Sequence, residues 1–110
     1  MSDISSEIHA LLRSYVETIN VEGMKILEES LKENPSIEFL CEATHKIKGG
    51  SGTAGFTELY QVTTSVNDQL KHIREHGGGL NKDIHSQLVQ LQIILKNTKP
   101  EASTLFGKYM

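Results

Sequence analysis

Cysteine, long apolar runs and clusters of charge of one sign are all scarce in this sequence, and each scarcity excludes a class of protein. Cys41 stands alone, so the chain cannot form an internal disulfide. The apolar runs are far shorter than the roughly 20 residues of a membrane-spanning helix, and the N-terminus lacks the basic and apolar regions of a signal peptide. The net charge is -3 with both signs interspersed, so no basic stripe is available for nucleic acid. We therefore expect a soluble cytoplasmic protein that binds neither membranes nor nucleic acid.

Apolar residues recur at helical spacing almost throughout the chain, and no stretch alternates in the way of a strand. The predicted helices cover residues 4–19, 20–34, 35–47, 57–76 and 81–97. Asn20 and Asn81 are expected to cap two of them, and Pro35 suits the first turn of the third. Short connections between long amphipathic helices favour an all-α fold, an antiparallel four-helix bundle with an additional N-terminal helix.

Each predicted helix has one apolar stripe that should face the core. In chain order the stripes are Ile4, Ile8, Leu11, Leu12, Tyr15 and Ile19; Met24, Leu27 and Leu31; Ile37, Leu40, Thr44 and Ile47; Leu59, Val62, Val66, Leu70 and Ile73; and Leu80, Ile84, Leu88, Leu91 and Leu95. Residues 1–98 should form the bundle, and residues 99–110 a C-terminal tail. The tail resembles a loose end, but Leu105, Phe106 and Tyr109 could dock as a short extra turn.

A cluster of glycines interrupts the third predicted helix. Four fall within residues 49–55: Gly49, Gly50, Gly52 and Gly55. Each costs roughly 1 kcal/mol relative to alanine in a helix interior, so helix stability does not explain the cluster. Glycine offers space instead, because it lets another molecule or helix approach the backbone closely.

His45, directly before the glycines, is the candidate reactive residue. It lies one position away from the core stripe of its helix, toward solvent. The neutral imidazole that prevails at cytoplasmic pH is a nucleophile. Lys48, one turn further along, would stabilise a phosphoryl group on that ring. Gly49 and Gly52 lie on the same face and would leave room for a second protein.

The segment His45-x-x-Lys48-Gly49-x-Ser51-x-x-x-Gly55 resembles the motif of the histidine-containing phosphotransfer (HPt) domain family. The continuation Gly-Gly-Ser-Gly-Thr-Ala-Gly-Phe is also similar to the phosphoacceptor domain of chemotaxis histidine kinases, a relative with the same helical core. The resemblance extends from the first helix to about residue 98. It implies a four-helix bundle with the phosphoacceptor histidine exposed on a central helix.

The resemblance also implies a function. His45 would accept a phosphoryl group from a phospho-aspartate on a response-regulator receiver domain and pass it to another receiver, with a hybrid sensor histidine kinase upstream. Lys48 matches the family's lysine, and Gly49 its small residue at the docking surface. The receiver would bring the aspartate and Mg²⁺, so no cofactor is expected on this chain. Because the sequence has no G-x-x-x-x-G-K-[ST] loop, we do not expect it to phosphorylate itself from ATP.

Further residues complete the predicted site. In many family members a polar side chain on the next helix holds the far ring nitrogen. Thr64 lies at the matching depth here, with Gln61 one turn before it and Asn67 and Asp68 after it. The residues expected to dock the receiver are Gly49, Gly52, Lys46, Ile47 and Phe56. We expect a monomer that binds no metal.

Three alternatives stay open. The chain could be a phosphoacceptor domain excised from a chemotaxis-type kinase, phosphorylated by that kinase's own ATP-binding domain. It could be a helical adaptor without phosphoryl chemistry, for which His45 would be dispensable. The helical pairs Cys41–His45 and His72–His76 could together bind zinc, although pairs four residues apart are common by chance.

Overall fold

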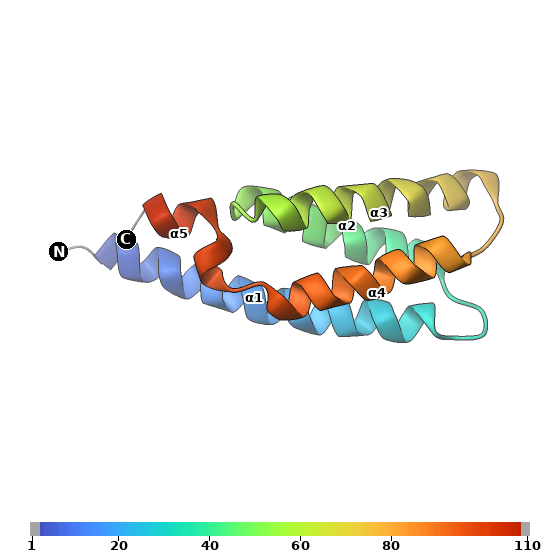
Figure 1. Ribbon diagram of the computed structural model, residues 1–110, viewed down its shortest axis with the longest axis horizontal. Coiled ribbons are helices and arrows are strands. Elements are labelled where there is room, and N and C mark those ends of the chain that lie inside the picture. The colour runs from blue at the N-terminus through green and yellow to red at the C-terminus, as the bar shows by residue number, and fades with distance from the viewer. Residues whose placement is uncertain (1–2, 109–110) are drawn as a thin grey trace.

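The computed structural model describes residues 3–108, which form four long helices followed by two short ones (Figure 1). The elements are α1 (Asp3–Ser30), α2 (Ile37–Thr53), α3 (Thr57–His76), α4 (Lys82–Asn97), the 3₁₀ helix η1 (Pro100–Ala102) and α5 (Thr104–Lys108). No strand occurs in this part of the chain. The predicted all-α fold is confirmed. None of the described helices is long and apolar enough to cross a bilayer.

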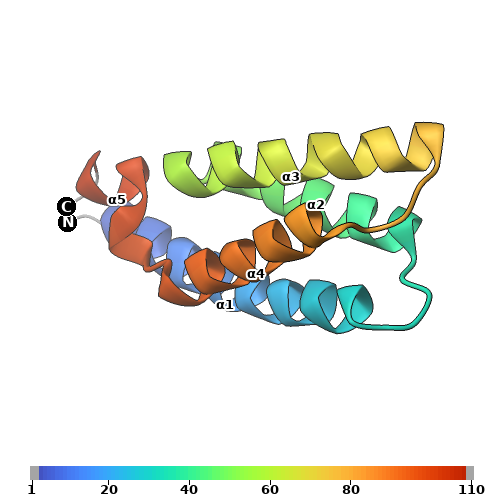
Figure 2. The ribbon, with the colours of Figure 1, turned by 45° about the vertical axis from the view of Figure 1, so that its right-hand side comes forward.

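The four long helices run up and down, joined by short connections at residues 31–36, 54–56 and 77–81. Helix α2 packs most extensively on α3, and α1 on α4, while α1 also contacts α2 and α3 contacts α4 (Figures 1 and 2). This cyclic order is that of an antiparallel four-helix bundle. Each helix therefore has two neighbours and one outer face.

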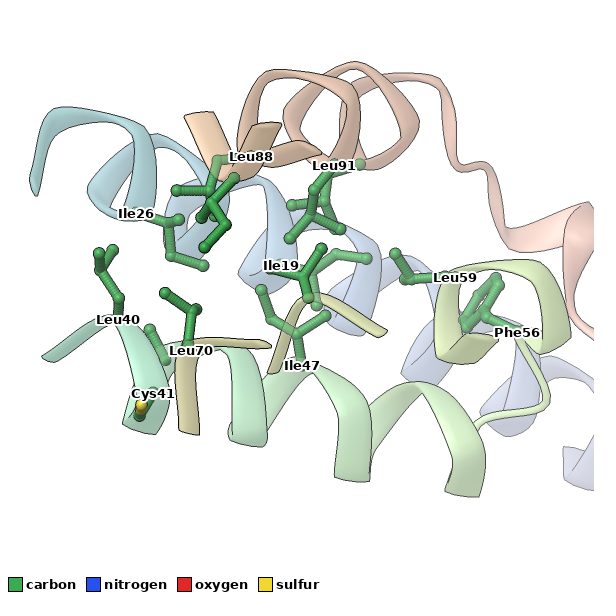
Figure 3. Close-up of a cluster of buried hydrophobic side chains, with 14 of the residues drawn as sticks. Ile19, Ile26, Leu40, Cys41, Ile47, Phe56, Leu59, Leu70, Leu88 and Leu91 are labelled. Carbon is green, nitrogen blue, oxygen red and sulfur yellow. The ribbon is translucent and has the colours of Figure 1, made fainter. Parts of the chain in front are cut away.

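The core lies along the axis of the bundle and draws on all four long helices (Figure 3). Ile19 and Ile26 of α1 meet Ile47 of α2, Leu70 of α3 and Leu88 of α4. All five are at most 2% exposed. Burying a side chain of this size contributes about 1.5–3 kcal/mol, so this apolar seam holds the helices together.

The first two predicted helices are one helix, and the expected break at Asn20 is wrong. The amide of Asn20 donates to the Val16 carbonyl 2.9 Å away, inside the helix, instead of capping a new one. No separate N-terminal helix therefore precedes the bundle. The predicted inward positions Met24 and Leu31 are also wrong: they are 57% and 71% exposed, and Ile26 takes the core position.

Two other predicted core positions, Ile4 and Leu11, are also exposed. The remaining stripes lie where they were expected, buried or half-buried. The predicted cap at Asn81 is confirmed, since its side chain accepts the Ile84 N–H at 2.9 Å. Pro35 lies outside α2, because Ser36 is the cap residue and accepts the Phe39 N–H.

The C-terminal segment is docked, not loose. Ser103 donates its hydroxyl hydrogen to the Ala54 carbonyl, and the Thr104 N–H donates to the Gly55 carbonyl at 3.0 Å. The ring of Phe106 stacks on His9 of α1 with 4.1 Å between centroids. Helix α5 therefore ties the α2–α3 connection to the start of α1 (Figure 2). The third residue considered for this contact, Tyr109, lies outside the described residues.

The connection from α1 to α2 is held by the carboxylate of Glu29. One oxygen accepts a hydrogen bond from the backbone N–H of Ser36 at 2.8 Å, and the other accepts one from the ammonium group of Lys32 at 2.9 Å. The hydrogen bond from Ser36, and then that from Lys32, lowers the pKa of this carboxyl group. Because the bonds favour the ionised form, the carboxylate stabilises the fold most when it is charged.

We predict that Glu29→Gln destabilises the protein at pH 7 and that the difference from the parent shrinks as the pH falls below about 4. The pKa is lower in the folded state than the ordinary value near 4.3. The stabilisation is therefore fully present above the unfolded-state pKa and is lost as the pH falls through the folded-state pKa. Urea denaturation of both proteins at pH 7 and pH 3 measures this.

Glu28→Gln is the matched control, because the exposed Glu28 side chain makes none of these hydrogen bonds in the described part of the chain. Equal losses of stability for the two variants at pH 7 would contradict the assignment of Glu29.

Candidate functional site

His45 lies on α2 with its side chain exposed. The two residues before it, Ala43 and Thr44, are buried in the core, and so is Ile47, two residues after it. The helical rotation of about 100° per residue therefore carries His45 out of the core and onto the flank of α2. Within residues 3–108 the imidazole has no hydrogen bond, ion pair or ring contact. Both ring nitrogens are free to meet another molecule.

A buried asparagine fixes the backbone just before His45. Asn67 of α3 is fully buried and donates its amide hydrogens to the Cys41 carbonyl at 3.0 Å and to the Thr44 hydroxyl oxygen at 2.9 Å. The Thr44 hydroxyl in turn donates to the Leu40 carbonyl. A polar group in the core is costly unless it is bonded, so these bonds specify how α2 sits on α3.

Sequence reasoning missed this role of Asn67. The available signal was an asparagine beside Val66, on the predicted core stripe of α3.

A tyrosine fixes the backbone just after His45 from the opposite side. Tyr15 of α1 donates its hydroxyl hydrogen to the Ile47 carbonyl at 3.0 Å, and its ring stacks on Phe56. Burial raises the pKa of Tyr15 to about 12, and the neighbouring Ser51 side chain lowers it by a smaller amount. The phenol therefore stays protonated and remains a donor throughout the physiological range.

The four clustered glycines have different surroundings. A Cβ on Gly50 would lie 2.6 Å from the Tyr15 ring, and one on Gly52 3.1 Å from the Tyr60 ring. Gly55 has a φ of 81° and faces Thr104. Neighbouring side chains or backbone conformation thus account for three of the four. A Cβ on Gly49 would meet nothing within 4 Å, so packing does not explain that glycine.

Beside the glycines is an open groove of about 480 Å³. Its lining residues are Gly49, Ser51, Gly52, Thr53, Gly55, Thr57 and Tyr60. Gly49 lies one helical turn after His45 and forms the nearest part of this lining. The histidine and the groove are therefore parts of one surface.

Thr64 lies across from Lys48. The α2–α3 register follows from two contacts, Gly52 with Tyr60 and Thr44 with Asn67, and Lys48 and Thr64 fall between them. This register therefore places Thr64 at the level of Lys48, three residues after His45, and the role predicted for Thr64 stays a prediction.

The Thr64 hydroxyl donates to the Tyr60 carbonyl at 2.7 Å. In the described residues neither Thr64 nor the exposed Gln61 is hydrogen-bonded to His45. The ring nitrogens are therefore not held from α3 in this structure.

Two of the residues expected to dock a receiver are wrong for that role. Ile47 and Phe56 are each 2% exposed and belong to the core, where they cannot touch a partner. Lys46 is exposed, and Lys48 is half-buried. Of the predicted docking residues, Lys46, Gly49 and Gly52 lie on the surface.

The site offers an accessible nucleophile with a cation one turn away. Lys48 follows His45 by three positions, the spacing at which helical side chains are neighbours. Such a cation can stabilise negative charge that arrives on the imidazole. The nearby thiol of Cys41 is buried, and burial raises its pKa, so it stays protonated and is a poor nucleophile. In residues 3–108 no three His, Cys, Asp or Glu side chains gather as a metal site would require.

Comparison with known families gives one match. The family model described as Hpt domain matches residues 5–98, which include all four long helices almost completely. No curated protein and no solved structure matches the chain.

The different surroundings of two adjacent glycines predict opposite effects on stability. Gly49→Ala should raise the free energy of unfolding by up to about 1 kcal/mol, because alanine is the better helix former and its methyl meets open space. Gly50→Ala should lower it by about 1–3 kcal/mol, because the methyl group overlaps the Tyr15 ring. Chemical denaturation of both variants measures the difference; equal stabilities would contradict the packing of Tyr15 on α2.

Proposed function

Because the chain belongs to the Hpt domain family, which acts by histidine phosphotransfer in two-component signalling, we propose that His45 is the phosphoacceptor of a phosphorelay. In this proposal His45 takes a phosphoryl group from an aspartyl phosphate on one receiver domain and gives it to the aspartate of another. A hybrid sensor histidine kinase stands upstream. The relay operates in the cytoplasm, with this chain as a monomer.

The observation that carries the proposal is the pairing of His45 with Gly49. The imidazole is exposed and unbonded within residues 3–108, and the glycine one turn later has no packing partner within 4 Å of an added Cβ. A glycine that destabilises its helix and relieves no contact inside the protein is explained by a contact outside it. The site of that contact is the surface that borders the histidine.

The chemistry needs little from this chain. A ring nitrogen of neutral His45 attacks the phosphorus, a P–N bond forms, and the P–O bond to the aspartyl group breaks. The aspartate leaves as a carboxylate, and the imidazole becomes cationic until it releases its other proton to water. Transfer to the second receiver reverses these steps. Phosphoryl transfer depends mainly on positioning and charge stabilisation, and the receiver's Mg²⁺ supplies part of the latter.

Lys48 and Lys46 have separate roles in this proposal. Lys48, half-buried and three residues after His45, stabilises the phosphoryl oxygens as they reach the ring. Lys46, exposed and turned further from the core, steers an acidic rim of the receiver toward the site. The first role concerns the transfer step, and the second concerns association.

We predict that His45→Gln folds as the parent does but accepts no phosphoryl group. The side chain is exposed, so its loss should change the free energy of unfolding by less than about 0.5 kcal/mol. A panel of radiolabelled phospho-receivers should give acid-labile, alkali-stable label on the parent alone. Label on His45→Gln would show that another residue is the acceptor.

The same assay separates the alternatives. Label that appears only when a chemotaxis-type kinase catalytic domain and ATP are supplied would favour an excised kinase domain. Label in neither assay would favour an adaptor without phosphoryl chemistry.

We predict that Lys48→Ala slows transfer at saturating phospho-receiver by about 10- to 100-fold, because the lost charge acts on the transferring group. Lys46→Ala is the matched control and should mainly raise the receiver concentration needed for half-maximal rate. Salt screens exposed charges, so the effect of Lys46→Ala should fade at 0.5 M salt while that of Lys48→Ala persists. Rapid-quench transfer assays at both salt concentrations distinguish them; equal salt dependence would refute separate roles.

A further inference from the structure

Tyr60 holds an unusual position at the edge of the His45 surface. It lies in the first turn of α3, and its ring packs over the bare backbone of Gly52, where an added Cβ would be 3.1 Å from Cδ2 and 3.2 Å from Cε2. The space left by Gly52 is thus occupied by a side chain of the same molecule. The expectation that Gly52 leaves room for a partner is replaced by this contact.

The Tyr60 ring is held in place and yet remains accessible. It is 38% exposed, and it lines the groove that also contains Gly49 and Gly52. Within residues 3–108 its hydroxyl makes no hydrogen bond. An aromatic side chain that is already ordered loses little conformational entropy when a partner covers it. Tyrosine is also among the residues that contribute most to binding at protein interfaces.

The distance from His45 places Tyr60 inside the area that a receiver must cover. A transient interface buries up to about 600 Å² on each partner, which corresponds to a circular patch about 14 Å in radius. Gly52 follows His45 by seven residues, a rise of about 10 Å along the helix. A receiver centred on His45 therefore reaches Gly52 and the ring packed on it.

We propose that Tyr60 is the aromatic anchor by which this protein binds its receiver domain. The proposal rests on the phosphotransfer function proposed for His45 and adds a residue on α3 that determines affinity and partner choice. The receiver covers the exposed part of the ring, while Gly52 supports the opposite part. Tyr60 takes no part in the transfer step.

The test uses a phospho-receiver that labels the parent. It compares the rate of phosphotransfer to the parent with the rates to Tyr60→Ala, Tyr60→Phe and Val89→Ala. Tyr60→Ala should lower kcat/KM by tenfold or more, mainly through KM, because an interface anchor is lost. Tyr60→Phe keeps the ring and should stay within about threefold of the parent. Val89→Ala removes an exposed apolar side chain from α4, which packs on α1 and α3, and should leave the rate unchanged.

Phosphoramidate, a small phosphoryl donor that needs no docking surface, separates docking from the reactivity of His45. Parent and Tyr60→Ala should be labelled by it at equal rates. The anchor role is refuted if Tyr60→Ala receives phosphate from the receiver as fast as the parent does. It is also refuted if Tyr60→Ala loses as much reactivity toward phosphoramidate as toward the receiver. If neither the phospho-receiver nor phosphoramidate labels the parent, the function proposed for His45 is refuted instead.

Discussion

The close approach of α2 to the helices on both of its sides is the constraint on which the site depends. Tyr15 of α1 lies against Gly50, and Tyr60 of α3 lies against Gly52. Each glycine weakens the helix by roughly 1 kcal/mol, and the packing of two aromatic rings on bare backbone offsets that loss. Helix α2 thus keeps its regular path to Thr53 although its last turns contain few side chains.

The same two neighbouring helices also fix the rotation of α2. Asn67 holds the Cys41 carbonyl from α3, and Tyr15 holds the Ile47 carbonyl from α1. These carbonyls lie four residues before and two residues after His45. The backbone that carries the histidine is therefore anchored on both sides, whereas its side chain has no bond within residues 3–108. A rigid support with a free imidazole is what a nucleophile needs if the partner protein supplies the rest of the site.

The sequence pattern predicted the helices and their inner faces well where one stripe dominates, as in α3 and α4. It failed on α1, because asparagine is a common cap residue. The Asn20 side chain instead donates to the Val16 carbonyl inside a continuous helix. The pattern also could not tell that Ile26, and not Met24, is buried in the core, since both fit a helical stripe and only the packing decides. For the site, the motif identified His45 as the candidate residue but did not predict that Phe56 is buried. That burial depends on Tyr15, which is distant in sequence and whose ring stacks on Phe56.

The four glycines of this motif do not share one explanation, because each has different surroundings. Gly50 and Gly52 admit rings from neighbouring helices, Gly55 permits a turn with positive φ, and Gly49 alone borders open space. The surface beside His45 is therefore not uniformly bare. Gly49 leaves open space one turn after His45, and the Tyr60 ring lines the same groove. A partner that fits both features is placed in one orientation on the helix, and a surface without side chains would not provide that selectivity.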